Sequence, residues 1–166
     1  MRTIQKFIVA ALLAAITAVP AQAQGYSEER LFEGFNDAVL TATLAEIGAT
    51  WETAESDDGA TFYQVTFESG LKAFAYFAAC DSGDCMGLTL VAVYDRPSGL
   101  TATEVDEIVR IYNDTYSAGK AIRGDDGSLL VQAYVISDHG ITMGNLLVQI
   151  QVFEDLAVKF AEGFDE

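Results

Sequence analysis

The most constraining stretch of the sequence is residues 72–94, where two apolar runs flank a short polar loop closed by the chain's only two cysteines. Cys80 and Cys85 bracket the four loop residues 81–84, and a loop of this length is typical of a β-hairpin. Directly opposed cysteines in an antiparallel pair lie near disulfide distance. We therefore expect a disulfide at the tip of a hairpin, with the rest of the domain built on its sheet.

The same register predicts which side chains share a face of the hairpin, because side chains alternate along a strand. One face is apolar throughout, and we expect it to form the core. Its pairs are Ala79 with Met86, Phe77 with Leu88, Ala75 with Leu90 and Ala73 with Ala92. The other face, on the side of the cysteines, is mixed, and we expect it to be only partly covered. Its apolar members are Phe74, Tyr76, Val91 and Val93.

The first 23 residues have the pattern of a cleaved secretory signal peptide. Arg2 and Lys6 precede an uncharged apolar run at residues 8–19, and Ala21-Gln22-Ala23 matches a cleavage site. We expect a single domain over residues 24–166, exported to the periplasm with no membrane anchor. An oxidising compartment would preserve the disulfide.

Charge narrows the range of partners. Removal of Arg2 and Lys6 takes the net charge from −16 to −18. Nucleic acids and anionic membranes would repel such a chain, so we expect no nucleic-acid partner. The acidic residues are scattered, which is typical of a solvated surface; a cationic partner is the alternative.

Periodicity and turn signals predict an antiparallel α+β domain of order α-β-β-β-β-α-β-β-α. Asn36 is a suitable N-cap for a helix over residues 36–48, Thr101 and Glu104 form a capping box for the second helix, and Thr142 or Asn145 begins the last. Outside the hairpin, strands are expected at residues 51–56, 60–67, 120–123 and 129–136.

Several short motifs follow one another in order over residues 36–162. They are Asp58-Gly59, Ser69-Gly70-Leu71, Ala79-Cys80 with Cys85 and Leu88, Tyr112-Asn113, Gly119-Lys120, Asp126-Gly127, and Gly140 followed by Phe153 and Phe160. In this arrangement the chain resembles the YbjN-like domain family of bacteria, in its exported, two-cysteine form. Tyr112 and Phe153 stand where the family tends to have tryptophan. The resemblance implies a fold similar to that of type III secretion chaperones. The family is labelled a sensory-transduction regulator, and it has no established catalytic activity.

The sequence contains no recognisable catalytic or metal-binding constellation. The C-x4-C spacing of Cys80 and Cys85 differs from the redox C-x-x-C motif, and no basic residue adjoins them to lower a thiol pKa. His139 is the only histidine, and the acidic loops do not match a calcium-binding loop. We expect no catalytic residues, no metal and no cofactor.

These observations favour a non-catalytic binding or chaperone-like module of the bacterial cell envelope. The expected binding face is Phe74, Tyr76, Val91 and Val93, and the partner is a protein, a peptide or a second copy of the chain. This requires the second and third helices to cover the Phe77–Leu88 face; the alternative is that the first helix buries the proposed binding face. A periplasmic thiol-disulfide redox protein using Cys80 and Cys85 is the other functional possibility.

Overall fold

The computed structural model describes residues 25–56, 59–81, 84–95 and 97–164. The predicted signal peptide, residues 1–23, lies outside them and stays a prediction. The helices are α1 (Asp37–Glu46), α2 (Ala102–Thr115) and α3 (Met143–Glu162). The strands are β1 (Leu31–Phe32), β2 (Thr50–Glu55), β3 (Thr61–Thr66), β4 (Lys72–Asp81), β5 (Asp84–Tyr94), β6 (Lys120–Arg123), β7 (Leu129–Ile136) and β8 (Ile141–Thr142).

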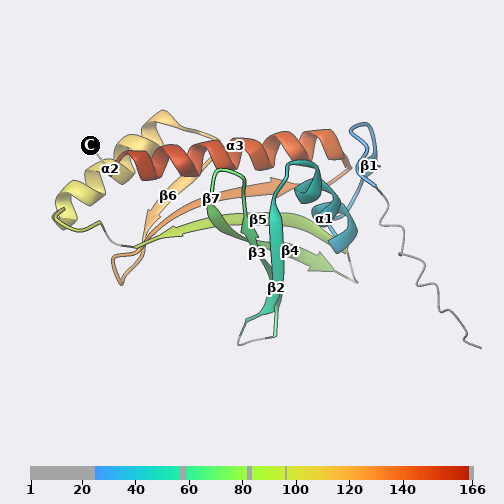
Figure 1. The fold of residues 1–166 in the computed structure, drawn as a ribbon, viewed down its shortest axis with the longest axis horizontal. Helices are drawn as coiled ribbons and strands as arrows, with labels where there is room; N and C mark the ends of the chain where they lie inside the picture. The colour runs from blue at the N-terminus through green and yellow to red at the C-terminus, as the bar shows by residue number, and fades with distance from the viewer. Residues whose placement is uncertain (1–24, 57–58, 82–83, 96, 165–166) are drawn as a thin grey trace, which may run out of the picture.

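The predicted α+β class and element order are confirmed. Six strands form an antiparallel sheet in the order β2-β3-β4-β5-β7-β6 (Figure 1). The short strands β1 and β8 form a second small sheet. Asn36 caps α1 and Thr101 with Glu104 closes a capping box on α2; Thr142, not Asn145, caps α3.

The hairpin of β4 and β5 has the predicted register. The ladder pairs Phe77 with Leu88 and Cys80 with Cys85, and the six pairs from Ala73–Ala92 to Ala78–Gly87 are all as expected. The predicted pair of Ala79 with Met86 was wrong: it is missing from the ladder, and both side chains are exposed. Ala79 has a φ of 51°, a left-handed conformation that interrupts the alternation of faces.

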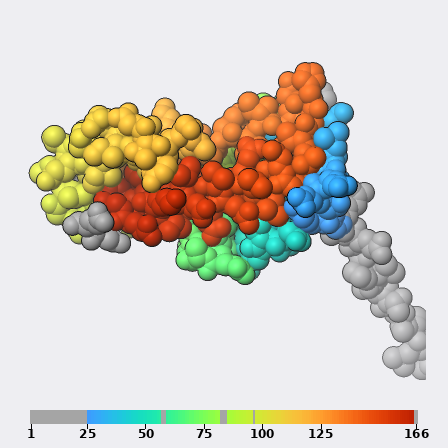
Figure 2. All heavy atoms as spheres, turned by 90° about the horizontal axis from the view of Figure 1, so that it is seen from above, coloured from blue at the N-terminus to red at the C-terminus, as the bar shows by residue number. Residues whose placement is uncertain are grey.

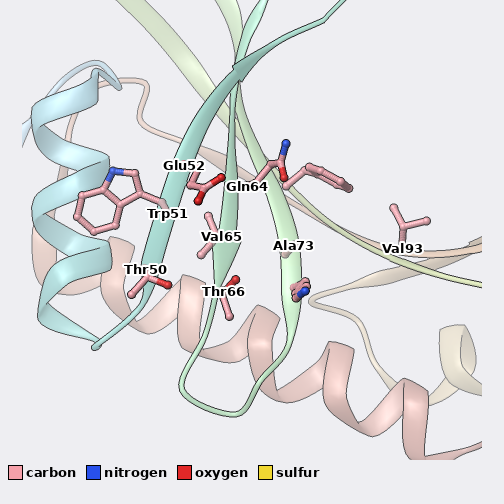
Figure 3. A pocket seen from close by; sticks show the side chains of 10 residues that line it. Thr50, Trp51, Glu52, Gln64, Val65, Thr66, Ala73 and Val93 are labelled. Carbon is pink, nitrogen blue, oxygen red and sulfur yellow. The ribbon is translucent and has the colours of Figure 1, made fainter.

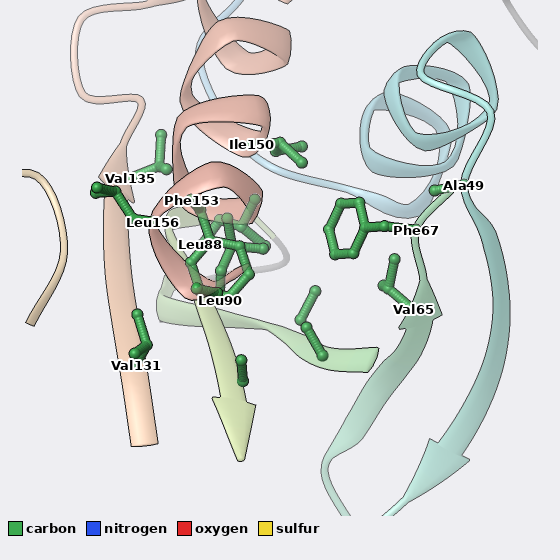
Figure 4. Packing of buried hydrophobic residues seen from close by; sticks show 14 of the residues in the cluster. Ala49, Val65, Phe67, Leu88, Leu90, Val131, Val135, Ile150, Phe153 and Leu156 are labelled. Atoms are coloured by element: carbon green, nitrogen blue, oxygen red, sulfur yellow. The ribbon is translucent and has the colours of Figure 1, made fainter. Parts of the chain in front are cut away.

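All three helices lie on the same side of the six-stranded sheet (Figure 1). The apolar stripe of α3 packs along β5 and β7, where Phe153 lies beside Leu88 and Leu90 (Figure 4). The inward-facing alternate residues of β3, β4, β5 and β7 complete this core. The largest fully buried side chains include Tyr63, Phe35, Phe153, Phe160, Leu40, Leu44, Leu88, Leu90 and Leu129.

The first helix, not the second, covers the Phe77 end of the core with α3. Tyr63, on the core face of β3, donates a hydrogen bond from its hydroxyl to Asp37 at the start of α1, and the Phe35 ring stacks on Phe77. The prediction that α2 and α3 cover the Phe77–Leu88 face is confirmed for α3, whereas α2 lies on the same side of the sheet but over β6. The alternative that α1 buries the opposite face was wrong. Figure 2 shows α2 beside the C-terminal half of α3, and α2 packs against β6.

Two tyrosines tie neighbouring elements to the backbone of α3. The hydroxyl of Tyr94, on β5, donates to the carbonyl of Ala157, and that of Tyr112, on α2, donates to the carbonyl of Leu156. The Phe160 ring contacts both tyrosine rings edge-on. Burial is the main cause that raises the pKa of each tyrosine to about 12.

Phe77 and Phe74 give a matched test of the two faces, because they are the same residue type on the same strand. Phe77→Ala should lower the free energy of unfolding by roughly 3–5 kcal/mol, since it removes packing against Phe35 and Tyr63. Phe74→Ala should cost clearly less, because that side chain is 37% exposed. Urea denaturation measures both values, and a larger cost for Phe74→Ala would contradict the assignment of the core face.

The disulfide should contribute little to stability, because it closes a short loop. The protein purified from its own host should show no alkylatable thiol without reductant. Replacing both cysteines by alanine should cost about 2 kcal/mol. The double variant should stay folded, since the backbone hydrogen bond from Phe35 N–H to the Cys85 carbonyl does not need the sulfur atoms. Circular dichroism is the measurement. A spectrum of an unfolded chain for the double variant would show that the disulfide is essential for folding.

The buried tyrosines should make stability fall at alkaline pH. Tyr94 and Tyr112 have folded pKa values of about 12, above the unfolded value of 10.0. Their contribution is complete below pH 10 and is lost as the pH rises through 12. Urea denaturation from pH 9 to 12 should therefore show a steeper loss for the wild type than for Tyr94→Phe with Tyr112→Phe. If the free energy of unfolding fell equally steeply with pH in the wild type and the double variant, the two tyrosines would not be the cause of the loss.

Candidate functional site

The candidate site is the face of the six-stranded sheet that points away from the helices, here called the open face. Strand alternation places Phe74 and Tyr76 from β4, Val93 from β5 and Tyr134 from β7 on this face. All four side chains are exposed, from 37% for Phe74 to 48% for Tyr134. None of the described helices packs against them, so the face presents apolar surface that the fold itself does not bury.

The open face is hollowed on both sides of Phe74. One hollow of about 550 Å³ is lined by Phe74, Tyr76, Phe62 and Leu130, among others, and is mostly apolar. The second, of about 540 Å³, lies between Phe74, Val93 and the polar side chains of β2 and β3. Figure 3 shows this second hollow, with Glu52 and Gln64 on the side of β2 and β3 that faces away from α1. A ridge between two hollows can position extended chain better than a flat surface.

The four predicted face residues do not have equal exposure. Phe74, Tyr76 and Val93 reach solvent, whereas Val91 is only 8% exposed. Val91 lies on a central strand, between Phe74 of β4 and Gln132 of β7, whose side chains shield it. Val91 is thus a floor of the first hollow and not a protruding contact.

Sequence reasoning missed the residues that neighbouring strands add to the open face. Phe62 packs edge-on against Phe74, and Leu130 lines the same hollow. Tyr134 lies over Gly87, where a β-carbon would clash with its ring and hydroxyl. The alternation of residues 60–67 and 129–136 carried this signal, but the order of strands in the sheet was needed to bring these side chains together.

The cysteine pair lies away from the open face, at the tip of the β4–β5 hairpin. Cys80 and Cys85 are joined with an S–S distance of 2.08 Å, and Cys80 is exposed. The carbonyl of Cys85 accepts a hydrogen bond from Phe35 N–H at 2.7 Å, which fixes the hairpin to the segment before α1. This contact gives the tip a structural role.

The titratable groups with shifted pKa values have structural causes. The capping contacts from Thr101 lower the pKa of Glu104, and hydrogen bonds from Arg110 lower that of Glu107. Burial and the hydrogen bond to Asp37 raise the pKa of Tyr63. His139 is almost fully exposed, and its Nε2 lies 3.7 Å from a carboxylate oxygen of Asp138. Within the described residues, no three His, Cys, Asp or Glu side chains are placed to hold a metal ion.

Over the residues that the structure describes, no helix combines the length and apolar character required to cross a bilayer.

Comparison with known proteins points to one family. A crystal structure, "Crystal structure of YbjN, a putative transcription regulator from E. coli", matches with a TM-score of 0.56 and 17% identity, over 80% of this chain and 93% of that one. At this identity the match shows a shared fold. No curated protein matches the sequence. The family model YbjN, described as "Putative bacterial sensory transduction regulator", matches residues 36–166. The chain therefore belongs to the YbjN family.

Proposed function

We propose that this protein is a non-catalytic binding module of the bacterial cell envelope, which holds a protein partner on the open face of its sheet. The observation that carries the proposal is the exposed apolar surface around Phe74 and Tyr76, flanked by two hollows and left uncovered by all three helices. Exposed apolar patches on a folded domain are usually contact surfaces. The shape of the face suits an extended or irregular segment.

Sequence features support an envelope location. The basic and apolar pattern of residues 1–23 is that of a signal peptide, and a disulfide such as that of Cys80 and Cys85 persists in an oxidising compartment. We propose export to the periplasm on these grounds.

The family description as a regulator is compatible with protein binding and does not require DNA binding. A net charge of −16, or −18 without residues 1–23, opposes contact with a phosphate backbone. We therefore propose that any regulatory role passes through a protein contact. The resemblance to type III secretion chaperones, in which subunits pair and extended client segments bind across apolar surface, supports the same kind of contact.

Charge substitutions on the open face test this proposal. Tyr76→Glu and Val93→Lys should each abolish co-purification of the envelope partner, because a charged side chain would then have to be desolvated in the interface. The melting temperature should hardly change, since both positions are exposed in the isolated domain. Quantitative mass spectrometry of cross-linked complexes from the envelope fraction gives the readout.

Val148→Lys is the matched control, because Val148 is an exposed valine on α3, on the helical side of the molecule. This variant should retain every partner. Light scattering of the wild type and of Tyr76→Glu separates self-association from binding of another protein. Equal capture by all three variants, or unfolding by Tyr76→Glu, would show that the open face is not the binding surface.

A further inference from the structure

The two edges of the six-stranded sheet are treated differently. At the β6 edge, the side chain of Asn113 on α2 makes two hydrogen bonds with the backbone of Ala121. Its Nδ2 donates to the Ala121 carbonyl at 3.0 Å, and its Oδ1 accepts from the Ala121 N–H at 2.8 Å. A carboxamide thus takes the position of a neighbouring strand, and α2 covers this edge. An added strand could not pair with β6 there without breaking both bonds.

At the other edge, β3 is the one described strand that pairs with β2. Ser56 N–H donates to the Ala60 carbonyl, which makes Ser56 and Ala60 a hydrogen-bonded pair at the end of this hairpin. Hydrogen-bonded pairs alternate along an antiparallel ladder. The backbone groups of Glu52 and Ala54 therefore bond to β3, whereas those of Thr53 and Glu55 point outward.

The outward groups of β2 are accessible. Figure 1 shows the hairpin of β2 and β3 extending beyond the layer of helices. No hydrogen bond within the described part of the chain reaches the outer edge of Thr53 or Glu55, and both residues are exposed. The six residues of β2 also contain no proline and no lysine, the usual obstacles to pairing at an edge. The edge is a ready template for another extended segment.

Charge selects the segment that fits this edge. Between Arg30 and Lys72 the chain has eight acidic residues and no basic one, and this stretch forms α1, β2 and β3. On β2 itself, Glu52 and Glu55 are an odd number of residues apart and so point to opposite faces. Basic residues on either side of an added strand would each meet a carboxylate, and opposite charges in neighbouring strands are favourable.

A second copy of the chain fits the edge poorly. Its own β2 would bring glutamates against glutamates, between molecules that each carry a charge of −16 or more negative. The basic side chains Arg110, Lys120 and Arg123 lie on α2 and β6, where the edge is already occupied by Asn113. A second molecule therefore cannot offer its basic strand β6 as a free strand to the β2 edge of the first.

We propose that the free edge of β2 binds an extended segment rich in lysine or arginine from a partner protein, which joins the sheet as an added antiparallel or parallel strand. The inference rests on the proposed function as a protein-binding module and names the chemistry of the bound segment. Main-chain hydrogen bonds to Thr53 and Glu55 supply the attachment, and Glu52 and Glu55 select for positive charge. This edge lies beside the hollow lined by Glu52, Gln64 and Phe74, so the partner can continue onto the open face.

A short peptide of alternating lysine and valine is the probe. The fluorescence of Trp51, the chain's single tryptophan and a residue of β2, should change on titration. By NMR, the amide protons of Thr53 and Glu55 should become protected from hydrogen exchange when the peptide binds. Those of Glu52 and Ala54 should be protected already in the free protein. Protection that does not follow this alternation would overturn the proposal.

Two comparisons separate strand addition from attraction between charges alone. The same peptide with its backbone amides methylated keeps its charge but cannot donate main-chain hydrogen bonds, and it should lose binding. Equal binding by the methylated peptide would overturn the proposal. On the protein, Glu52→Lys with Glu55→Lys should weaken binding by roughly five- to tenfold. The control Asp138→Lys with Glu162→Lys makes the same change in net charge at exposed positions elsewhere and should have a much smaller effect.

The outcome for the edge can be distinguished from that for the open face. Tyr76→Glu leaves the backbone of β2 intact, so the protection of Thr53 and Glu55 by the peptide should persist in that variant. Persistence together with unchanged capture of the envelope partner would refute the open-face proposal but support the edge. Loss of partner capture in Tyr76→Glu, without any peptide protection at β2 in the wild type, would support the open face and refute the edge.

Discussion

The packing of α3 along the central strands is the contact on which the rest of the structure depends. Its 20 residues span about 30 Å, and the 11 residues of β5 span roughly 37 Å, so one helix covers most of the length of the sheet's centre. Phe153, Leu156 and Phe160 supply the apolar stripe, and Tyr94 and Tyr112 fix the helix by hydrogen bonds to its backbone. With α1 and α2 on the same side, every described helix is committed to one face.

One-sided burial explains both candidate binding features. A sheet covered on one face must expose the other. Here the exposed face carries aromatic side chains where a purely solvated surface would carry polar ones. The hairpin of β2 and β3 reaches beyond the helices, which leaves its outer edge unpaired. The surface and the edge meet near Glu52 and Gln64, at the hollow that Lys72 and Phe74 also line. The strand at the edge, β2, lies in the part of the sequence between Arg30 and Lys72, which contains no basic residue.

The sequence predicted local structure well because local signals decide it. The register of the hairpin followed from two cysteines and a four-residue loop, and the helix starts followed from Asn36, Thr101 and Thr142. The aromatic residues that depart from the family pattern keep a core position, since Tyr112 is 5% and Phe153 1% exposed. Ala79 was misplaced because nothing in an apolar run signals a left-handed residue.

Local sequence signals did not predict where the helices lie on the sheet or in which order the strands pair. Both α1 and α2 carry apolar residues, so apolar pattern alone does not place them; long-range contacts such as Tyr63 with Asp37 and Asn113 with Ala121 show where each helix lies. The open face was predicted from the hairpin alone, so Phe62, Leu130 and Tyr134 were absent from it. Val91 was expected at the surface because its shielding by neighbouring strands depends on long-range pairing.

The carboxamide of Asn113 has a consequence for how such domains can assemble. A sheet with two unpaired edges can grow indefinitely, since each molecule that joins offers a fresh edge to the next, and the product is a filament. With the β6 edge occupied by Asn113, β2 is the one free edge that the described six-stranded sheet offers. Strand addition at the sheet edge would therefore end after one partner, and a complex formed in this way would keep a fixed stoichiometry even at high protein concentration.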